Sequence, residues 1–254
     1  MRVFILSLTI FLLFSCGGKK VESSREKTLN DQKGLATASL LRGNFQRALI
    51  DIKQAEKIDG SDPEVYNIEG LVYFGLKAYK EAEKSYKKAI NLKSDYSEAR
   101  YNLCGLYLTL DELDNAIEQC SKASSDLVYR SRDKAFTSLG VAYFRKGNID
   151  KARECYQKSL EINPALVYTH NELGVLYMST GKEEEAIEEF KKAVNGYDLY
   201  DEAHYNLGLA YLKIGKVEDA CASFKKVTEI SPESALGVNA KGYLTSLCKG
   251  REKL

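Results

Sequence analysis

Small residues return at intervals of about 34 positions along most of this chain, and this period limits the possible folds more than any other feature. One set consists of Ala48, Ala82, Ala116, Ala152, Ala186 and Ala220, spaced by 34, 34, 36, 34 and 34 residues. Twelve residues before each alanine lie Ala36, Gly70, Cys104, Gly140, Gly174 and Gly208. Four residues after each alanine lie Ile52, Tyr86, Cys120, Tyr156, Phe190 and Phe224. Such a period is typical of a stack of similar helical units that bury their apolar faces against one another.

The pattern resembles the tetratricopeptide repeat, which combines Leu-Gly, Tyr, Ala, an aromatic residue and Pro in a helix–turn–helix unit of about 34 residues. The resemblance covers residues 29–234 and implies an all-α, right-handed superhelical solenoid. We expect six repeats, at residues 29–62, 63–96, 97–130, 133–166, 167–200 and 201–234, and then a capping helix and tail over residues 235–254. Small residues let the two helices of a unit cross closely, and we expect the aromatic residues to fill the gap between one unit and the next.

Each unit needs a left-handed backbone residue where its first helix ends, and glycine is best suited to that position. Four units carry it there, as Gly43, Gly147, Gly181 and Gly215. The second unit carries Lys77 and the third carries Asp111. We therefore expect these two turns to be less favourable.

Composition and charge exclude several classes of protein. The formal net charge is +1 over 254 residues, whereas nucleic-acid-binding proteins show a clear basic excess. Three prolines favour long helices. His170 and His204 occupy equivalent positions 34 residues apart, so we interpret them as packing residues rather than catalytic groups. The sequence carries no phosphate-binding loop, nucleophile elbow or metal-binding helix, so we predict a protein that is no enzyme, with no cofactor, metal or nucleic-acid partner.

The N-terminus has the form of a signal peptide over residues 1–15, with a basic start and an apolar stretch, Val3–Phe14, too short to span a membrane. The end of this stretch, residues 13–16, reads Leu-Phe-Ser-Cys and resembles a bacterial lipobox. The resemblance implies cleavage before Cys16, acylation of Cys16, and a lipid anchor in the outer membrane on its periplasmic face. The alternatives are an ordinary signal peptide that contains a cysteine, and a buried helix. The polar composition of residues 16–28 predicts a flexible tether.

Five cysteines remain besides Cys16, an odd number in a compartment that permits disulfides. They are Cys104, Cys120, Cys155, Cys221 and Cys248. Cys104 and Cys120 fall on the two helices of the third unit and form the first candidate pair. Cys221 with Cys248 is a weaker candidate. The alternative is that the cysteines are small core residues.

In proteins of the tetratricopeptide family the first helix of each unit lines a concave surface, and the resemblance implies a partner-binding groove there. Its residues would be Leu71, Phe74, Tyr101, Asn102, Leu108, Val141, Phe144, Asn171, Val175, Met178, Tyr205, Asn206, Leu209 and Leu212. Many are apolar or aromatic, with asparagines that could bond to a peptide backbone, so the groove suits a protein segment with apolar anchors. The alternative is that several of them merely pack against neighbouring helices. We expect the chain to be monomeric.

The link between the third and fourth units reduces the number of possible functions, because it is two residues longer than the others and makes this repeat interval 36 residues instead of 34. It carries Tyr129, Arg132, Phe136 and Gly140, with Arg130 directly after the tyrosine. This spacing resembles the type IV pilus biogenesis lipoproteins, the pilotins of the PilF/PilW/Tgl type, in which a proline often follows the tyrosine. The resemblance implies an outer-membrane lipoprotein that binds secretin subunits and promotes their localisation and assembly. The alternative is a general periplasmic scaffold lipoprotein for cell-wall or outer-membrane protein assembly.

Overall fold

The computed structural model describes residues 23–248, and all regular structure in that range is helical. The elements are α1 (Ser24–Leu41), α2 (Phe45–Ile58), α3 (Pro63–Gly75), α4 (Tyr79–Leu92), α5 (Ser97–Thr109), α6 (Leu113–Ser125), α7 (Arg132–Arg145), α8 (Ile149–Ile162), α9 (Val167–Ser179), α10 (Glu183–Gly196), α11 (Asp201–Lys213), α12 (Val217–Ile230), α13 (Ala235–Tyr243) and the π-helical turn η1 (Leu244–Cys248). The expected signal peptide, the lipidated Cys16, most of the tether and residues 249–254 lie outside the described residues. No helix in the described range is both long and apolar enough to cross a membrane.

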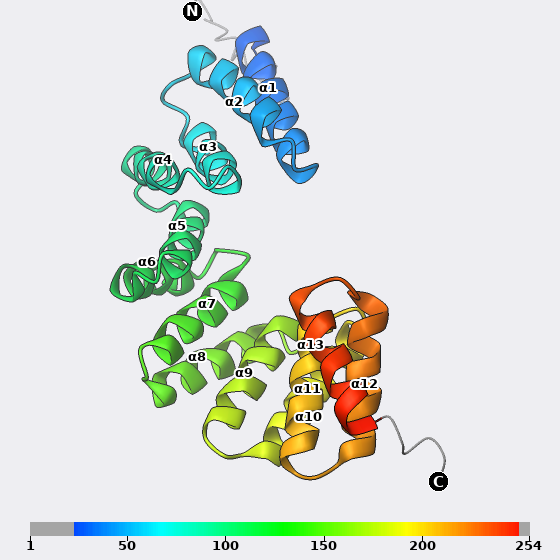
Figure 1. Ribbon diagram of the computed structural model, residues 1–254. Coiled ribbons are helices and arrows are strands. Elements are labelled where there is room, and N and C mark those ends of the chain that lie inside the picture. Colours follow the sequence, from blue (N-terminus) through cyan, green and yellow to red (C-terminus); the bar gives the residue numbers. More distant parts are fainter. Residues whose placement is uncertain (1–22, 249–254) are drawn as a thin grey trace, which may run out of the picture.

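Consecutive helices form six hairpins that stack into a right-handed superhelix, from α1–α2 at one end to α11–α12 at the other (Figure 1). Each odd-numbered helix from α1 to α9 also contacts the next odd-numbered helix. Within the described range the backbones of successive even-numbered helices do not come into contact, although a side-chain ion pair joins Lys88 of α4 to Glu56 of α2. The odd-numbered helices therefore form the continuous inner, concave layer, and the all-α solenoid expected from the repeat period is confirmed.

Glycine lets the two helices of a repeat approach closely. A Cβ atom on Gly70 would lie 2.5 Å from the ring of Tyr86, and one on Gly140 would lie 2.5 Å from the ring of Tyr156. Tyr86 also packs in one cluster with Leu106 of the next repeat. The expectation that these rings fill the gap between repeats was therefore incomplete. Each ring first occupies the space that the glycine of its own repeat leaves empty.

The third repeat has cysteines at these two positions, and a disulfide joins Cys104 to Cys120 with their Cα atoms 5.4 Å apart. A second disulfide joins Cys221 on α12 to Cys248 in η1, so the weaker candidate pair is bonded as well. Cys155 is a free thiol, and burial raises its pKa to about 11. A thiol with so high a pKa is a poor nucleophile at neutral pH.

The turns inside the repeats have the expected left-handed backbone. The φ angles of Gly43, Gly147, Gly181 and Gly215 are 72°, 80°, 71° and 76°. Lys77 and Asp111 take the same conformation with φ of 59° and 58°. Because the Cβ atom of these two residues crowds the following carbonyl group, the second and third repeats carry strained turns.

Helix α1 begins at Ser24, five residues before the expected start of the first repeat at Leu29. The Ser23 hydroxyl accepts a 3.1 Å hydrogen bond from the Glu26 amide and caps the helix. The Arg25 side chain donates to the carbonyl oxygen of Ile58 at the end of α2. Residues 24–28 therefore belong to the solenoid rather than to the tether, because capping and a side-chain bond order a segment with little apolar surface.

The C-terminal end of the solenoid is covered as expected. Helix α13 and η1 pack on α12, and α13 also contacts α11. The ring of Tyr243 stacks on that of Phe224, with centroids 4.6 Å apart and an interplanar angle of 7°. The capping segment thus covers Phe224, which a seventh repeat would cover if one were present.

Candidate partner-binding groove

A pocket of about 160 Å³ opens on the concave layer where α3, α5 and α7 meet. It is lined by Leu71, Phe74, Tyr86, Tyr101, Asn102, Gly105, Leu106 and Ser138. A Cβ atom on Gly105 would meet nothing within 4 Å, so this glycine widens the pocket without being required for helix packing. The lining is mostly apolar and aromatic, and the pocket suits one apolar side chain of a bound segment.

Twelve of the fourteen residues expected in the groove are partly exposed. Leu71, Phe74, Tyr101 and Asn102 line the pocket. The remaining eight lie along the odd-numbered helices: Leu108, Phe144, Val175, Met178, Tyr205, Asn206, Leu209 and Leu212.

Val141 and Asn171 were wrongly placed in the groove. Val141 has 6% of its surface exposed and Asn171 has none. Val141 packs in one cluster with Leu173 and Leu176 of the next repeat. The inner helix of each repeat covers part of the one before it, so a residue on an inner helix is not always open to a partner.

Two groove asparagines have a different role from the one expected. The amide nitrogen of Asn102 donates a 2.8 Å hydrogen bond to Asn67, and that of Asn206 donates a 3.0 Å hydrogen bond to Asn171. Each bond joins neighbouring inner helices. These amides are therefore engaged in holding repeats together, and apolar side chains form most of the free groove surface.

The long link between α6 and α7 presents two apolar side chains to solvent. Leu127 is 79% exposed and Val128 is 88% exposed. After these two residues, the ring of Tyr129 lies 6.4 Å from that of Tyr101, and the Arg132 side chain donates a 3.0 Å hydrogen bond to a carbonyl oxygen at the end of α6. Of the link residues singled out in the sequence, Tyr129 therefore holds the loop against the groove and Arg132 holds it to α6.

Sequence reasoning missed a carboxylate on the concave layer. Glu172 on α9 takes the position in its repeat that Asn102 and Asn206 take in theirs. It is part-buried and accepts a long, 3.4 Å hydrogen bond from Asn171. Burial and then the charge of Glu202 raise the pKa of Glu172 to about 7. An acid at an asparagine position of the repeat was the signal that could have identified it.

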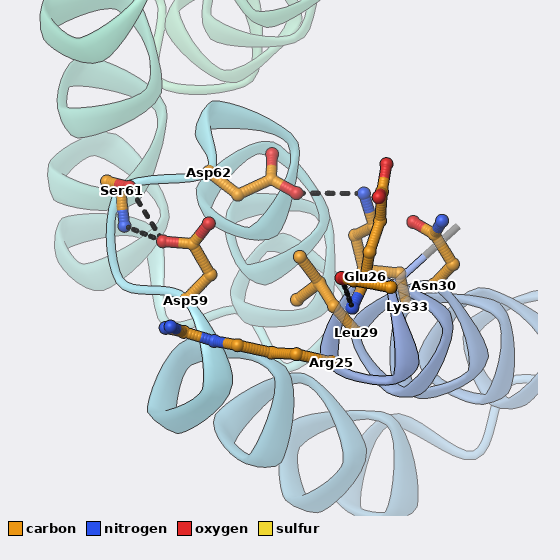
Figure 2. Close-up of a pocket in the computed structure, with 9 residues that line it drawn as sticks. Arg25, Glu26, Leu29, Asn30, Lys33, Asp59, Ser61 and Asp62 are labelled. Carbon is orange, nitrogen blue, oxygen red and sulfur yellow. Dashed lines mark hydrogen bonds and ion pairs between the residues drawn. The ribbon is translucent and has the colours of Figure 1, made fainter. Parts of the chain in front are cut away.

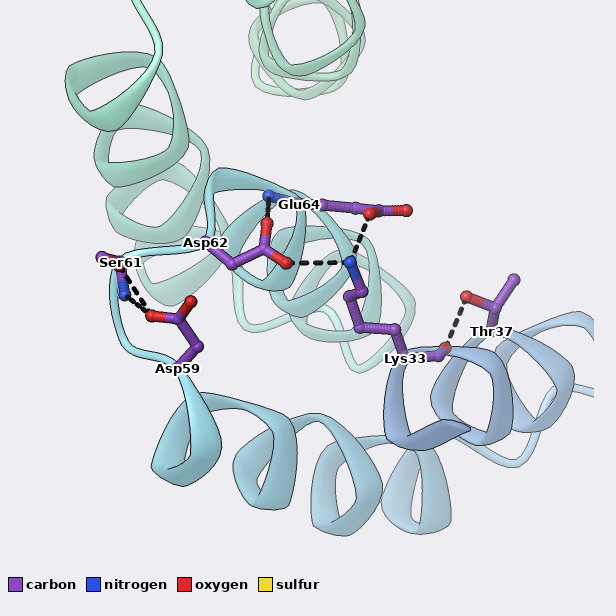
Figure 3. A network of polar contacts seen from close by, with 6 residues as sticks. All are labelled: Lys33, Thr37, Asp59, Ser61, Asp62 and Glu64. Atoms are coloured by element: carbon purple, nitrogen blue, oxygen red, sulfur yellow. Dashed lines mark hydrogen bonds and ion pairs between the residues drawn. The ribbon is translucent and has the colours of Figure 1, made fainter. Parts of the chain in front are cut away.

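A second, larger pocket of about 550 Å³ lies between α1 and the turn that joins α2 to α3, and its lining is polar. Figure 2 shows Arg25 and Lys33 of α1 reaching towards Asp59 and Asp62 of that turn. Lys33 is bonded to Asp62 at 2.8 Å and to Glu64 at 2.6 Å, as Figure 3 shows. Burial lowers the pKa of Lys33, but these two carboxylates outweigh it and raise the pKa above its ordinary value.

Arg25 and Asp59 of this second pocket also have partners. Arg25 bonds to the Ile58 carbonyl oxygen, and the Asp59 carboxylate accepts 2.9 Å and 2.6 Å bonds from the amide and hydroxyl of Ser61. The second pocket is therefore a polar contact that fixes α1 to the second repeat. The groove pocket is the better binding site.

The two histidines bond to links between repeats. The Nε2 atom of His170 donates to the Pro164 carbonyl oxygen at 2.9 Å, and that of His204 donates to the Asp198 carbonyl oxygen at 3.0 Å. The Nδ1 atom of His170 also donates to Glu189 at 2.6 Å. Within residues 23–248, no group of three or more His, Cys, Asp or Glu side chains could hold a metal ion.

Models of the tetratricopeptide repeat match the chain at residues 63–96, 133–166, 155–188, 174–215 and 201–234. Together these matches cover more than half of the sequence. The chain belongs to the tetratricopeptide repeat family, whose members bind other proteins through stacked helix pairs.

Within this family, the chain is similar to proteins of type IV pilus biogenesis. It is 24% identical over 164 residues to the type IV pilus assembly protein PilF of Pseudomonas aeruginosa, an alignment that spans 63% of this chain and 65%, less than two thirds, of PilF. The solved structure of P. aeruginosa PilF matches 87% of this chain and 99% of its own, with a TM-score of 0.75 and 19% identity. The solved structure of PilW, a widely conserved type IV pilus biogenesis factor, matches 85% of this chain and 99% of its own, with a TM-score of 0.76 and 20% identity. These structures share its fold.

Proposed function

We propose that this chain is a pilotin, a lipoprotein held on the periplasmic face of the outer membrane by an acylated Cys16. In this role its groove binds secretin subunits and promotes their localisation and assembly into multimers. The likeness to PilF and PilW carries the proposal, because it extends over 99% of each of those two solved chains. The lipobox and the long third link support it.

The groove would act by binding alone. A membrane-tethered binding site raises the local concentration of its partner near the membrane, which favours assembly without any chemical step. The pocket between α3, α5 and α7 would hold an apolar anchor of the subunit. The exposed Leu127 and Val128 lie at the tip of a loop held against that groove and offer a second apolar contact.

Deletion of the gene tests the proposal. We expect loss of heat-resistant secretin multimers and of twitching motility, both restored by the wild-type gene. A Cys16→Ala variant should fold, but it should no longer be found in the outer-membrane fraction and should fail to restore secretin multimers in the deletion strain. Normal multimers and normal twitching in the deletion strain would reject the pilotin role and favour the general scaffold instead.

A Gly105→Leu variant tests the groove itself. The new side chain fills the pocket, while its Cβ atom meets no other group. We expect secretin binding to fall by at least about tenfold, since one well-seated apolar anchor contributes about 1.5–3 kcal/mol. Gly34→Leu on the exposed side of α1 is the matched control, because its Cβ atom also meets nothing within 4 Å. Binding can be measured by surface plasmon resonance. Equal affinities of the two variants for secretin would place the binding surface elsewhere.

A further inference from the structure

Two carboxylates on the concave layer have no cationic partner in the described part of the chain. Glu172 lies on α9, and Glu202 lies in the first turn of α11. Other acids of the last two repeats are paired with lysines: Glu189 with Lys192, Glu183 with Lys213, and Asp198 with Lys226. Asp201, next to Glu202, accepts a 2.6 Å hydrogen bond from the Ser231 hydroxyl. The charge of Arg145 reaches Glu172, but its guanidinium donates its 2.8 Å hydrogen bond to the Leu108 carbonyl oxygen.

Tyrosines surround these carboxylates. The charges of both Glu172 and Glu202 act on Tyr168 and on Tyr200, which places the four side chains near one another. Tyr168 is 43% exposed, so its ring is open to a ligand. Aromatic faces attract cations, most strongly where water is partly excluded.

A buried hydroxyl at the same place lacks a partner. The Tyr156 side chain has no exposed surface, and its hydroxyl makes no hydrogen bond within the described residues. The ring packs on Gly140 as that of Tyr86 packs on Gly70, and Tyr86 lines the groove pocket. Tyr156 is therefore directed to the same concave side, where Glu172 and Tyr168 influence its hydroxyl. A buried unpaired hydroxyl is costly, and it marks a place where the polar groups are not all satisfied within the described residues.

We propose that Glu172 and the tyrosines around it receive a lysine or arginine side chain of the protein segment that binds in the groove. The assignment of that segment to a secretin subunit rests on the proposed function, but the preference for a cation does not. The groove would then recognise two side chains of one bound segment. An apolar side chain would lie in the pocket between α3, α5 and α7, and a basic side chain would lie between α9 and α11.

The carboxylate of Glu172 lowers the stability of the folded chain, and a role in binding explains why such a residue is present. Because the pKa of Glu172 is raised to about 7, ionising it at neutral pH destabilises the folded chain. A Glu172→Gln change should therefore raise the melting temperature at pH 8. A purely structural residue would not raise stability on removal and weaken binding at the same time.

The test uses the full chain in detergent and overlapping peptides from the periplasmic part of the secretin encoded in the same genome. Wild type, Glu172→Gln and the exposed control Glu185→Gln are compared on the native peptides and on copies with norleucine for lysine and citrulline for arginine. We expect the bound peptides to contain a basic residue. Its neutralisation should cost wild type about tenfold in affinity and cost Glu172→Gln about nothing. Equal binding of native peptides by wild type and Glu172→Gln would overturn the proposal.

A second peptide set separates this inference from the proposed function. It consists of unrelated extended peptides with one apolar anchor and lysine, norleucine or glutamate at a single position. If wild type does not bind the secretin peptides but prefers lysine in the unrelated set, the proposed function is rejected and the cation site is supported. If wild type binds secretin peptides and shows no preference for lysine in either set, the cation site fails and the proposed function stands.

The pH dependence provides a further readout. Facing Glu172 are Arg145 from α7, Tyr156 from α8, Tyr168 from α9, Tyr200 from the link between α10 and α11, and Glu202 from α11. Burial raises the pKa of the three tyrosines, so they stay neutral between pH 5.5 and 8, and burial also raises the pKa of Glu202. Affinity for the lysine peptide should rise about tenfold over this range in wild type, and clearly less in Glu172→Gln. A rise of the same size in both proteins would contradict the role of Glu172.

Discussion

At one position in the repeat, four side chains of different types make the same bond. The Tyr66 hydroxyl, the Arg100 guanidinium, and the His170 and His204 rings each donate to a carbonyl oxygen six residues earlier. These carbonyl groups belong to the links between repeats, which have no helical partner for them. The position therefore requires a donor of sufficient reach rather than one residue type.

The two histidines should respond to pH in opposite directions. The hydrogen bond to Glu189 raises the pKa of His170, whereas burial lowers the pKa of His204. The contribution of His170 is therefore complete below about pH 6.5, the ordinary histidine pKa, and is lost as pH rises through its folded-state pKa. The contribution of His204 is complete above about pH 6.5 and declines as pH falls towards its folded-state pKa.

We expect His170→Asn to cost more stability at pH 5.5 than at pH 8.5, and His204→Asn to show the reverse. Urea unfolding of both variants and wild type at the two pH values measures this. A change of the same sign in both variants would contradict the assigned roles.

The strained turns offer a stability gain. Lys77→Gly and Asp111→Gly remove a left-handed non-glycine residue, which costs about 1–2 kcal/mol, against a glycine entropy cost of about 0.5–1 kcal/mol. We expect each change to stabilise the chain by about 0.5–1 kcal/mol, and the two gains to add. Lys84→Gly on the exposed side of α4 is the control and should cost about 1 kcal/mol. No gain in denaturant midpoint for either turn variant would show that these turns are relaxed.

At the scale of the helices, the repeat period predicted much of what the structure contains. The six helix pairs and the glycine turns follow from residues that recur at fixed offsets, and the capping segment follows from its place directly after the last repeat. The bonds between repeats could not be predicted in this way, because Asn102 and Asn67 belong to different units and their meeting depends on how the units stack. The same holds for the burial of Val141, whereas Glu172 left a signal in the sequence, an acid at a position where two other repeats have asparagine. The early start of α1 was missed because a polar segment carries no apolar period.

The cysteine pair of the third repeat occupies the positions that glycine and an aromatic ring fill elsewhere. A disulfide that closes a loop of about 16 residues contributes roughly 3 kcal/mol. We expect Cys104→Ser/Cys120→Ser to lose about that amount. Cys104→Gly/Cys120→Tyr should recover part of it, because a ring over glycine fills the same space in neighbouring repeats.

Both double variants are best compared with Cys221 and Cys248 changed to serine, so that reductant acts on one disulfide only. Chemical unfolding with and without reductant gives the free energies. The Gly–Tyr variant should not respond to reductant. If it is no more stable than the double serine variant, the disulfide and the aromatic ring are not interchangeable at this site.

At the scale of the whole molecule, stability comes from neighbouring contacts only, since each helix pair touches the pairs directly before and after it. A helix pair at an open end therefore lacks the contacts that one neighbouring pair would provide. The polar contact of Lys33 with Asp62 and Glu64 holds α1 at one end. The aromatic stack of Tyr243 on Phe224, reinforced by the second disulfide, holds the cap at the other. Loss of the cap exposes an apolar face on which a second chain could pack.

One glycine decides whether the cap can dock. A Cβ atom on Gly237 would collide with the backbone carbonyl oxygen of Ser231, which a side-chain rotation cannot relieve. We expect Gly237→Ala to cost about 1–3 kcal/mol and to release α13 from α12. Gly242→Ala on the same helix is the control: its Cβ atom meets nothing within 4 Å, so it should be neutral or stabilise by about 0.5–1 kcal/mol. Limited proteolysis should cut Gly237→Ala within residues 235–248, and the Cys221–Cys248 disulfide should retain the fragment until reductant is added. Equal protease resistance of the two variants would show that the cap docks without this close approach.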